Sequence, residues 1–519
     1  MPPHSITGVE QFLSKVDEVD GLASDWPHAD PPRDTVFYVC TYTNNDILAH
    51  IPKGDRGEGI YAWRLEAATG TLRQLAASRV EPNPAFVVHD AARNLLYAST
   101  ECIHKKGCGE VITLAADESG EPGALREAGR VSAGGRSTCY LNLLRGGRMA
   151  VVNYWDAIVS LHPVCPTNGI VGPACDQHMQ PGADYVFETN PDRVEHWTHR
   201  QRWPHTHCFV TEPYHGVLHF VPDLGVDKIW VYKVDGGCHK EQDAAKLVLC
   251  GGVQLEHGQG PRHIVFHPRV RTAYVVNELL STVSVLKVQP ECLAGFPGDL
   301  LSEPIDMDGF SEESVLFEVQ KIRTLPEHFE SLDHHKSHAS EIRIHPSGRF
   351  VLVANRGHDS IAVFAVDEAN SGRLSLTSIT PSGGVFPRNF NFDATGHYVL
   401  VGNQNSNNLT LFAFDVDTGL MKNSLQTVYQ PSPNFILGVA AGDADALTRN
   451  KTSQEHTNQD DQGVALSKGA KGELRSTNDC KSEPKVRLNK WLLLATPEQV
   501  ALGCVLVFWI YSILHRTGA

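Results

Sequence analysis

The sequence lacks several features that mark common classes of protein. Its net charge is −15, with 45 Lys and Arg residues against 60 Asp and Glu residues, so it has no excess of basic residues for binding nucleic acid, and we expect no such partner. Twelve cysteines occur without a repeated CxxC spacing, which argues against a zinc ribbon or a disulfide framework and suits a reducing compartment. No phosphate loop or dinucleotide fingerprint stands out, and we expect no cofactor.

Long helical periodicity is also missing from the body of the chain. Between about residues 34 and 437, apolar and polar residues alternate at period two, and turn residues separate the runs. The first 20 residues have neither the basic region nor the apolar region of a secretory signal. We therefore expect an N-terminal extension over residues 1–33 and a cytoplasmic location.

The C-terminal part differs in composition from the body. Residues 440–490 are polar and rich in Asp, Lys, Ser, Thr and Asn, which predicts a disordered linker. Residues 491–519 contain the uncharged apolar run Val500 to Leu514, flanked by Lys, Arg and Trp. This run is shorter than the ~20 residues of a full span. We interpret the tail as an apolar helix that anchors the chain on the cytosolic face of an intracellular membrane, with a packing helix as the alternative.

Seven segments of the body repeat one pattern: an apolar run, a polar residue, a short turn and a second strand. The residues that close the first run are Tyr42, Glu101, Tyr154, Asp223, Glu278, Arg356 and Gln404, at spacings of 59, 53, 69, 55, 78 and 48 residues. Such spacings are typical of four-stranded propeller blades with loop insertions, so we predict an all-β, seven-bladed propeller over residues 34–439.

The two ends of this body complete each other. The run SPNFILGV at residues 432–439 has no partner strands after it, whereas FYVCTY near the N-terminus has no strand before it. We predict that these two segments pair within one blade and so close the ring, which removes an open sheet edge.

Each repeat is preceded by another strand, and several of these strands start with polar residues. In GPRHIVFHP, Arg262 and His263 come directly before the apolar run, and the alignment places Arg262 opposite His207, Ser340 and Arg388 of other blades. The first strand of a propeller blade lines the central channel, so charged residues there face water or a ligand instead of a dry core. We therefore predict one polar cavity, with the ring that includes Glu101, Glu278 and Gln404 beside it.

The side chains of this cavity indicate chemistry on an anionic ester. Three arginines supply planar, permanently charged donors suited to carboxylate or phosphate: Arg262, Arg356 and Arg388. His205 and His207 are two residues apart, so on a strand both point to one face. Glu278 and Glu101 are candidate general bases or orienters of a histidine. Together such groups suit attack on, or formation of, an ester carbonyl where oxyanion charge develops. The alternative is a structural salt-bridge network.

Two groups of histidines raise the question of a metal site. His205 and His207 have no recognisable third ligand. The segment HFESLDHHKSHASE contains four more histidines, and its place in an insertion predicts a solvated loop: His328, His334, His335 and His338. We expect no metal. We expect Cys40, Cys102 and Cys208 to be core or lining thiols and not nucleophiles.

The motifs GPRH, NEL, NRGHDSI and PRNF, in register with every blade from about residue 34 to 437, resemble the seven-bladed propeller lactonase family. This family includes the propeller type of 6-phosphogluconolactonase and the carboxy-cis,cis-muconate cyclases. The resemblance implies a metal-independent enzyme that acts on anionic lactones or their open acids. It also implies catalytic roles for His205 or His207, Arg262, Glu278 and Arg356. The chain departs from the family at Cys40, where glycine is usual, and in its histidine-rich insertion, linker and tail.

The resulting hypothesis is hydrolysis of 6-phospho-D-glucono-1,5-lactone to 6-phosphogluconate, a step of the pentose phosphate pathway. Glu278 or a histidine at 205 or 207 activates water, Arg262 and Arg356 hold the anion and stabilise the oxyanion, and the remaining residues bind substrate: His263, Arg388, Glu101 and Gln404. Two alternatives stay open, a carboxy-cis,cis-muconate lactonising cyclase and a non-catalytic propeller scaffold tethered to a membrane. The sequence indicates no oligomeric state.

Overall fold

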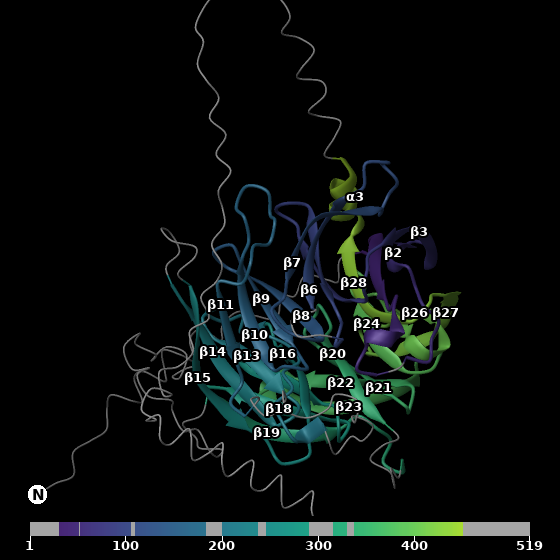
Figure 1. Cartoon of the computed structure of the whole chain (residues 1–519). Coiled ribbons are helices and arrows are strands. Elements are labelled where there is room, and N and C mark those ends of the chain that lie inside the picture. Colours follow the sequence, from purple (N-terminus) through teal and green to yellow (C-terminus); the bar gives the residue numbers. More distant parts are fainter. Residues whose placement is uncertain are drawn as a thin grey trace, which may run out of the picture. The chain divides into compact units, whose positions relative to one another are not determined.

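The computed structural model describes residues 31–50, 52–104, 109–182, 200–236, 245–289, 315–329 and 337–449. Within these residues the strands form seven four-stranded antiparallel sheets, each a blade of an all-β propeller, which confirms the predicted fold (Figure 1). The apolar tail at residues 491–519, most of the predicted linker and most of the N-terminal extension lie outside the described residues.

Each blade begins with an innermost strand and ends with an outermost one. The innermost strands are β28 (Pro433–Ala440), β4 (Pro84–Asp90), β8 (Thr138–Leu144), β12 (Val210–Thr211), β16 (Pro261–Phe266), β20 (His338–Ile344) and β24 (Pro387–Phe392). The second strands are β1 (Thr35–Thr41), β5 (Leu95–Thr100), β9 (Arg148–Asn153), β13 (His219–Asp223), β17 (Thr272–Asn277), β21 (Phe350–Arg356) and β25 (Tyr398–Asn403). The third strands are β2 (Gly59–Glu66), β6 (Glu110–Ala116), β10 (Ile158–Pro163), β14 (Lys228–Asp235), β18 (Thr282–Val288), β22 (Ser360–Asp367) and β26 (Asn408–Phe414). The outermost strands are β3 (Thr71–Arg79), β7 (Leu125–Ser132), β11 (Asp176–Met179), β15 (Lys246–Gln254), β19 (Leu316–Arg323), β23 (Arg373–Pro381) and β27 (Met421–Tyr429).

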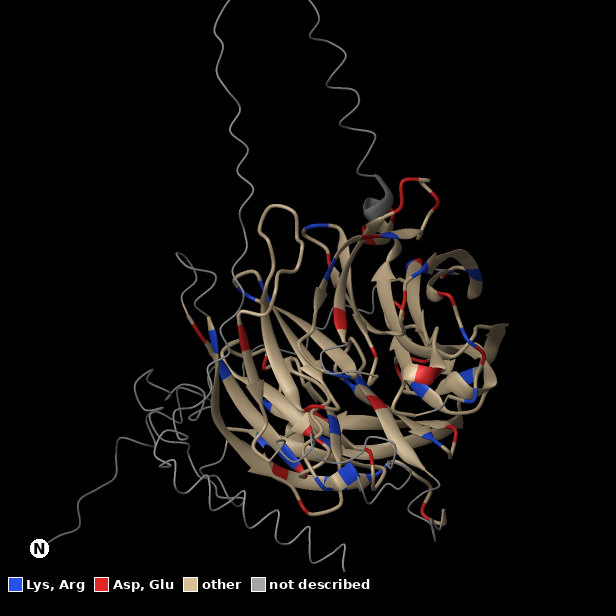
Figure 2. Ribbon diagram, in the orientation of Figure 1, with Lys and Arg blue, Asp and Glu red and all other residues tan. Residues whose placement is uncertain are grey.

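Burial changes along each blade and explains the sequence pattern. The second strand β21 is buried over its whole length, which is why it reads as the nearly continuous apolar run FVLVANR. The outermost strand β7 has a single buried residue, Leu125, and is otherwise polar. In the view of Figure 2, basic residues are interspersed with acidic ones over the ribbon.

The ring closes as predicted. β28 pairs with β1 in antiparallel register, with Phe37 opposite Gly438, so the C-terminal strand is the innermost strand of the N-terminal blade (Figure 1). β28 also contacts the innermost strands β24 and β4 of the two neighbouring blades. Closure in this way pairs the edge of β1 that would otherwise be open, and gives the N-terminal blade the same four strands as the others.

The start of the predicted linker is ordered. Residues Ala441–Arg449 form the helix α3, which packs on β28 and β1. Ala441 and Ala444 are buried, and Asp445 pairs with Arg64 at 3.6 Å, so these residues bury enough surface to order a segment that its composition marks as polar. Within the described ranges, no helix is long and apolar enough to cross a membrane.

An extra residue interrupts every innermost strand near its start. The pairing register with the second strand shifts there, as in a β-bulge, and the residues that the shift leaves over are Ala85, Cys139, Arg262, Arg388, Asn434 and the pair Ser340–Glu341. The fourth blade has the same surplus between Thr206 and Val210. A bulge re-aims its side chain, and the bulges of three blades bring Cys139, Arg262 and Arg388 within electrostatic range of one another.

The fourth blade departs from its predicted strand. β12 contains only Val210 and Thr211, and His205 and His207 precede it. Two side chains form hydrogen bonds to the backbone there. Asp223 Oδ1 accepts the N–H of His205 at 2.6 Å, and the Cys139 thiol donates to the carbonyl of His207 at 3.3 Å. The two histidines are therefore not on one face of a regular strand.

Candidate active site

The site is organised around the carboxylate of Glu278. The N–H of Glu278 donates to the carbonyl of Gly260 at 2.8 Å, which ties the end of the second strand to the start of the innermost one. Gly260 has φ +63°, and a Cβ there would lie 2.5 Å from Leu279 Cγ, so the turn requires glycine. Arg262 follows on its bulge, and its Nε lies 3.2 Å from Glu278 Oε2.

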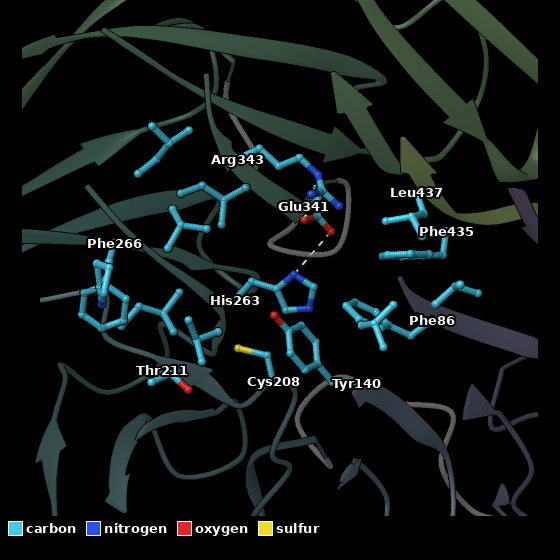
Figure 3. A pocket seen from close by; sticks show the side chains of 18 of the residues that line it. Phe86, Tyr140, Cys208, Thr211, His263, Phe266, Glu341, Arg343, Phe435 and Leu437 are labelled. Carbon is cyan, nitrogen blue, oxygen red and sulfur yellow. Dashed lines mark ion pairs between the residues drawn. The ribbon is translucent and has the colours of Figure 1, made fainter. Parts of the chain in front are cut away.

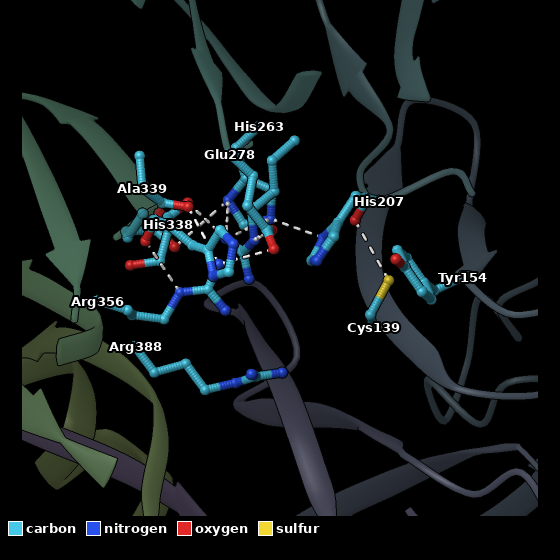
Figure 4. Close-up of polar contacts among 12 residues, drawn as sticks. Cys139, Tyr154, His207, His263, Glu278, His338, Ala339, Arg356 and Arg388 are labelled. Atoms are coloured by element: carbon cyan, nitrogen blue, oxygen red, sulfur yellow. Dashed lines mark hydrogen bonds and ion pairs between the residues drawn. The ribbon is translucent and has the colours of Figure 1, made fainter. Parts of the chain in front are cut away.

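Three buried or largely buried arginines converge on this carboxylate. Arg200 Nη1 and Arg356 Nη2 lie 2.6 and 2.9 Å from Glu278 Oε1, and Arg262 completes the group. Glu278 and Arg356 are labelled in Figure 4. Burial alone raises the pKa of Glu278, but the three guanidinium groups outweigh it and hold that pKa well below its usual value. Glu278 therefore stays ionised, and its low pKa makes it a weak base, which favours a role in holding the arginines.

A second carboxylate lies on the other side of the cluster. Glu101 Oε2 accepts the hydroxyl of Tyr42 at 2.8 Å, and its Oε1 accepts the hydroxyl of Ser137 at 2.9 Å. Arg388 Nη2 lies 3.9 Å from Glu101 Oε2, its single ion-pair partner among the described residues, while its guanidinium carbon lies 5.6 Å from the centre of the Tyr42 ring. Arg388 is thus the least neutralised arginine of the cluster.

The cluster carries excess positive charge. Four guanidinium groups (Arg200, Arg262, Arg356 and Arg388) share two carboxylates, Glu101 and Glu278, so their net charge is plus two. Burial lowers the pKa of Arg356 only to about 10, so it remains protonated at neutral pH. Buried charge is poorly screened by solvent, and an anion that entered the cluster would be strongly attracted.

A line of three side chains runs beside the arginines. His207 Nδ1 and His263 Nε2 are 3.1 Å apart, and His263 Nδ1 lies 3.4 Å from Glu341 Oε2. Burial and the nearby Arg262 lower the pKa of His207 well below its usual value and that of His263 to about 4. Both imidazoles are neutral at pH 7, and a neutral imidazole accepts a proton.

His205 is placed differently from His207. Its ring stacks on Tyr154 with centroids 4.6 Å apart, and its Nδ1 lies 3.2 Å from the Tyr154 carbonyl, whereas His207 meets the same ring edge-on at 5.4 Å. Tyr154 in turn accepts hydrogen bonds from Arg200 at 3.1 and 3.3 Å through its hydroxyl. His207 is therefore the histidine that connects Tyr154 to His263.

Gln404 and the histidines of the predicted insertion loop are placed differently from the other predicted residues. Gln404 is buried in the short helix η7 (Gln404–Ser406). Its Nε2 donates to Asn405 at 3.4 Å and its Oε1 has no partner among the described residues, so no side-chain hydrogen bond within them joins it to the cluster. His338 is not in a solvated loop: it begins β20, and its carbonyl accepts Arg356 Nε at 3.2 Å. His334 and His335 lie outside the described residues. Within the described ranges no group of three ligands could hold a metal ion.

Sequence analysis missed three members of the site. Arg200 lies in an irregular segment that no motif marks. Glu341 follows Ser340 on the bulge of β20, so the alignment that placed Ser340 in the cavity could have included it. His50 has a buried Nε2 without a partner among the described residues, its ring lies 5.6 Å from that of Tyr42, and burial lowers its pKa to about 4.

The innermost strands also line a second cavity, beyond the bulges that carry the charged cluster. A cavity of about 590 Å³ is lined mainly by apolar side chains, among them Phe86, Tyr140 and Phe435, together with His263 and Glu341 (Figure 3). The Phe86 ring lies 4.2 Å from those of both Tyr140 and Phe435, measured between centroids. His263 and Glu341 therefore stand between the arginine cluster and an apolar cavity.

Fold and site together define a seven-bladed propeller whose channel holds a cationic cluster with neutral histidines beside it. The chain belongs to the family described as "Lactonase, 7-bladed beta-propeller", which it matches over residues 36–295 and 301–437. The family resemblance expected from the motifs is thus confirmed.

Individual relatives agree with this assignment. The chain is 30% identical over 399 residues to a 6-phosphogluconolactonase of Bacillus subtilis, an alignment that covers 77% of this chain and 96% of that protein. It is 27% identical over 369 residues to a 6-phosphogluconolactonase of Formosa agariphila, covering 70% and 91% of the two chains. The crystal structure of the periplasmic gluconolactonase PpgL of Pseudomonas aeruginosa superposes with a TM-score of 0.61 and 26% identity, covering 78% of this chain and 99% of that one.

Proposed function

We propose that the chain hydrolyses an anionic sugar lactone, with 6-phospho-D-glucono-1,5-lactone as the first candidate. The observation that carries the proposal is the net positive, buried arginine cluster next to a neutral histidine. The relatives named as sugar lactonases support the reaction class. The phosphorylated substrate, and with it a place in the pentose phosphate pathway, is favoured because the cluster's excess charge matches a phosphate dianion.

Arg388 is the group that we assign to the substrate anion. It has a single ion-pair partner among the described residues, at 3.9 Å, so most of its donors remain for a ligand. The other arginines are engaged with Glu278 or with backbone carbonyls: Arg262 Nη1 donates to Ser340 at 2.6 Å, and Arg356 Nη2 to Ala339 at 3.1 Å. These bonds fix the guanidinium groups in place, as preorganised stabilisation of an oxyanion requires.

His207 is the group that we assign as the base. As its Nε2 takes a proton from water, the water oxygen attacks the lactone carbonyl and the carbonyl oxygen becomes an oxyanion facing Arg262. The oxyanion then collapses and the ring C–O bond breaks, the ring oxygen takes the proton back from His207 Nε2 and leaves as a hydroxyl, and the new carboxylic acid releases its proton to solvent. Arg262 depresses the pKa of His207, so a bound dianion that offsets the cationic charge raises it and makes His207 a better base.

The decisive experiment measures ring opening of freshly generated 6-phosphogluconolactone by the full chain, corrected for spontaneous hydrolysis. We expect turnover well above background. Arg388→Gln should raise KM for the phosphorylated lactone about 10- to 100-fold, because a hydrogen bond to a charged group contributes about 1.5–3 kcal/mol, and should leave glucono-1,5-lactone unaffected.

Arg349→Gln is the matched control, because Arg349 is an exposed arginine that bonds to the carbonyls of Val416 and Asp417 far from the cluster. An equal loss with both lactones would contradict the assignment of Arg388. Failure of the full chain to open either lactone would turn attention first to carboxymuconate-type lactones and then to a scaffold role. The cytoplasmic location and the membrane-anchoring tail remain predictions.

A further inference from the structure

We infer that Glu341 and His263 are positioning residues that hold His207 in the tautomer whose Nε2 accepts a proton. The chemical use of this tautomer rests on the proposed function. The hydrogen-bond order itself is a property of the free protein, and it is tested separately below.

The direction of the hydrogen bonds along Glu341, His263 and His207 is set at Glu341, whose carboxylate can only accept hydrogen bonds. Its Oε2 accepts Asn389 Nδ2 at 2.6 Å and lies 3.4 Å from His263 Nδ1, and its Oε1 lies 3.5 Å from Arg343 Nε. The carboxylate is surrounded by donors, and Arg343 and His263 lower its pKa against the effect of burial, so it is ionised. An ionised carboxylate has no proton to give, and His263 Nδ1 must therefore carry the hydrogen between them.

The tautomer of His263 in turn fixes the tautomer of His207. A neutral imidazole has one N–H, so His263 Nε2 is left with a lone pair and accepts the Nδ1–H of His207 across 3.1 Å. His207 Nε2 is then the nitrogen without hydrogen. Arg262 Nη1 is a more distant donor, 3.4 Å from both ring nitrogens of His263, and it donates to the Ser340 carbonyl at 2.6 Å, so the His207 N–H at 3.1 Å is the closer donor to the His263 lone pair.

The charges around the two rings give Glu341 a second effect. His207 is faced by Arg262, His263 and Tyr154, with Cys139 bonded to its carbonyl and with Arg388 and Glu278 acting at longer range. His263 is faced by Arg262, Arg343, Tyr140 and Glu341. Glu341 is thus the anion in direct contact with the histidine pair. Glu341 acts on a proton at His207 through His263, and Glu278 favours the same proton at longer range.

The position of Glu341 separates this role from substrate binding. Glu341 and His263 line the apolar cavity (Figure 3), and the ion-pair partners of Glu341 among the described residues are His263 and Arg343 and not the arginines of the cluster. A change at Glu341 therefore alters the state of His207 without removing a donor from the substrate anion. The test can use this difference, because loss of positioning lowers kcat while leaving KM almost unchanged.

The test variant is Glu341→Gln in the full chain. Glutamine keeps the size of the side chain. With its oxygen toward Arg343 Nε, its amide nitrogen takes the place of Oε2 and donates an N–H to His263 Nδ1, and the bond from Asn389 is lost. That reverses the order of the line, so that His263 Nε2–H donates to His207 Nδ1 and places the His207 proton on Nε2. We expect kcat for the lactone to fall about 100-fold or more, as when a catalytic histidine is held in the wrong tautomer, with KM within about twofold.

The rate–pH profile supplies a readout that a merely structural role would not move. Glu341 raises the pKa of His263, the ring that accepts the Nδ1–H of His207, so we expect its neutralisation to move the acid limb of the kcat profile to lower pH. Glu212→Gln is the matched control: Glu212 is an equally buried glutamate that accepts the backbone N–H groups of His215 and Val217 at 2.7 and 2.8 Å. The Glu212→Gln variant should leave both kcat and the acid limb of the rate–pH profile unchanged.

Long-range ¹⁵N NMR of histidine side chains tests the hydrogen-bond order without any substrate. Signals lost in His207→Gln identify the ring. We expect the Nδ1–H tautomer of His207 in the wild type and the Nε2–H tautomer in Glu341→Gln. A wild-type His207 that already carries its proton on Nε2, or a variant with unchanged tautomer and kcat, overturns the inference. A wild type without lactonase turnover overturns the proposed function instead, and the NMR result still decides the tautomer.

Discussion

The two ends of the channel are built from the same innermost strands and have opposite chemistry. β16 contributes Arg262 and His263 to the charged cluster and Ile264 to Phe266 to the wall of the apolar cavity. β20 behaves alike, with Ser340 and Glu341 at its bulge and Ile342 and Ile344 at the cavity. The boundary between the two ends falls at the bulge, where the regular alternation of side chains is broken.

This difference shows how a propeller places charge inside itself. Along an unbroken strand, successive side chains point to opposite faces, and each face packs against a neighbouring blade. The surplus residue at each bulge leaves this pattern, so its side chain reaches groups of other blades, as Arg262 reaches Glu278 and the Ser340 carbonyl. Beyond the bulge the alternation resumes and buries apolar side chains.

The largest effect on stability is expected at the charged end. Glu278→Gln leaves Arg200, Arg262 and Arg356 without their shared carboxylate, and breaking a buried ion pair in this way costs about 3–5 kcal/mol of unfolding free energy. Denaturant unfolding of the full chain measures it. Glu368→Gln, which breaks an exposed pair with Arg269, serves as the control and should cost much less. Equal losses of unfolding free energy in the two variants would mean that solvent screens the ion pairs of the cluster as well as it screens the exposed pair.

The next largest effect concerns the pH dependence of stability, which we expect to differ between one histidine at each end of the channel. His50 at the charged end and His89 at the cavity each have a buried Nε2 without a partner among the described residues. Burial lowers both pKa values; Arg388 adds to the effect at His50, whose pKa falls to about 4, whereas Asp443 and Asp90 oppose it at His89. The native state then binds fewer protons than the unfolded state between pH ~6.5 and 4, so stability is lost as pH falls through that window.

Replacement by phenylalanine removes the titrating group while keeping a ring. We expect His50→Phe to reduce the acid-induced loss of unfolding free energy by about 1–3 kcal/mol and His89→Phe to reduce it by less. Thermal or denaturant unfolding at pH 7 and at about pH 4.5 measures both. A larger gain from His89→Phe would reverse the assigned order of the two environments.

The smallest effect is expected at the cavity. Leu437→Ala trims a half-buried side chain that lines this space and should cost about 1–2 kcal/mol of stability, below the range for fully buried leucines. Because Leu437 touches neither the arginines nor the histidine line, kcat for the lactone should stay within about twofold of wild type. A clear loss of rate would show that the cavity end also serves the reaction.

Much of the fold is predictable from the sequence because each blade repeats one period-two pattern. The seven repeats, and the unpaired runs near residues 37 and 436, predict both the blade count and the closure of β28 onto β1. The helix α3 was not predictable, because its ordering depends on a contact of Ala441 and Ala444 with a distant strand. Local composition alone marks that segment as linker.

The part of the site that lies on the repeat was predictable, since the blade positions of its residues recur. Arg262, Arg356, Arg388, His207 and Glu278 come together as the alignment predicts. Arg200 was not predictable, because it lies outside the repeat and reaches Glu278 only through the folded chain. The state of Glu278 was not predictable either, since its low pKa is set by three guanidinium groups from separate segments.

The sequence by itself determined the architecture and the kind of side chain present at the channel, because strand alternation and blade period are local properties that repeat along the chain. Only the tertiary structure decided which charges meet, which remain unpaired, and which histidine nitrogen is left to accept a proton. Those outcomes depend on distances of a few ångströms between blades and on bulges that shift the register by one residue. Coulomb energy and hydrogen-bond direction are fixed at that scale.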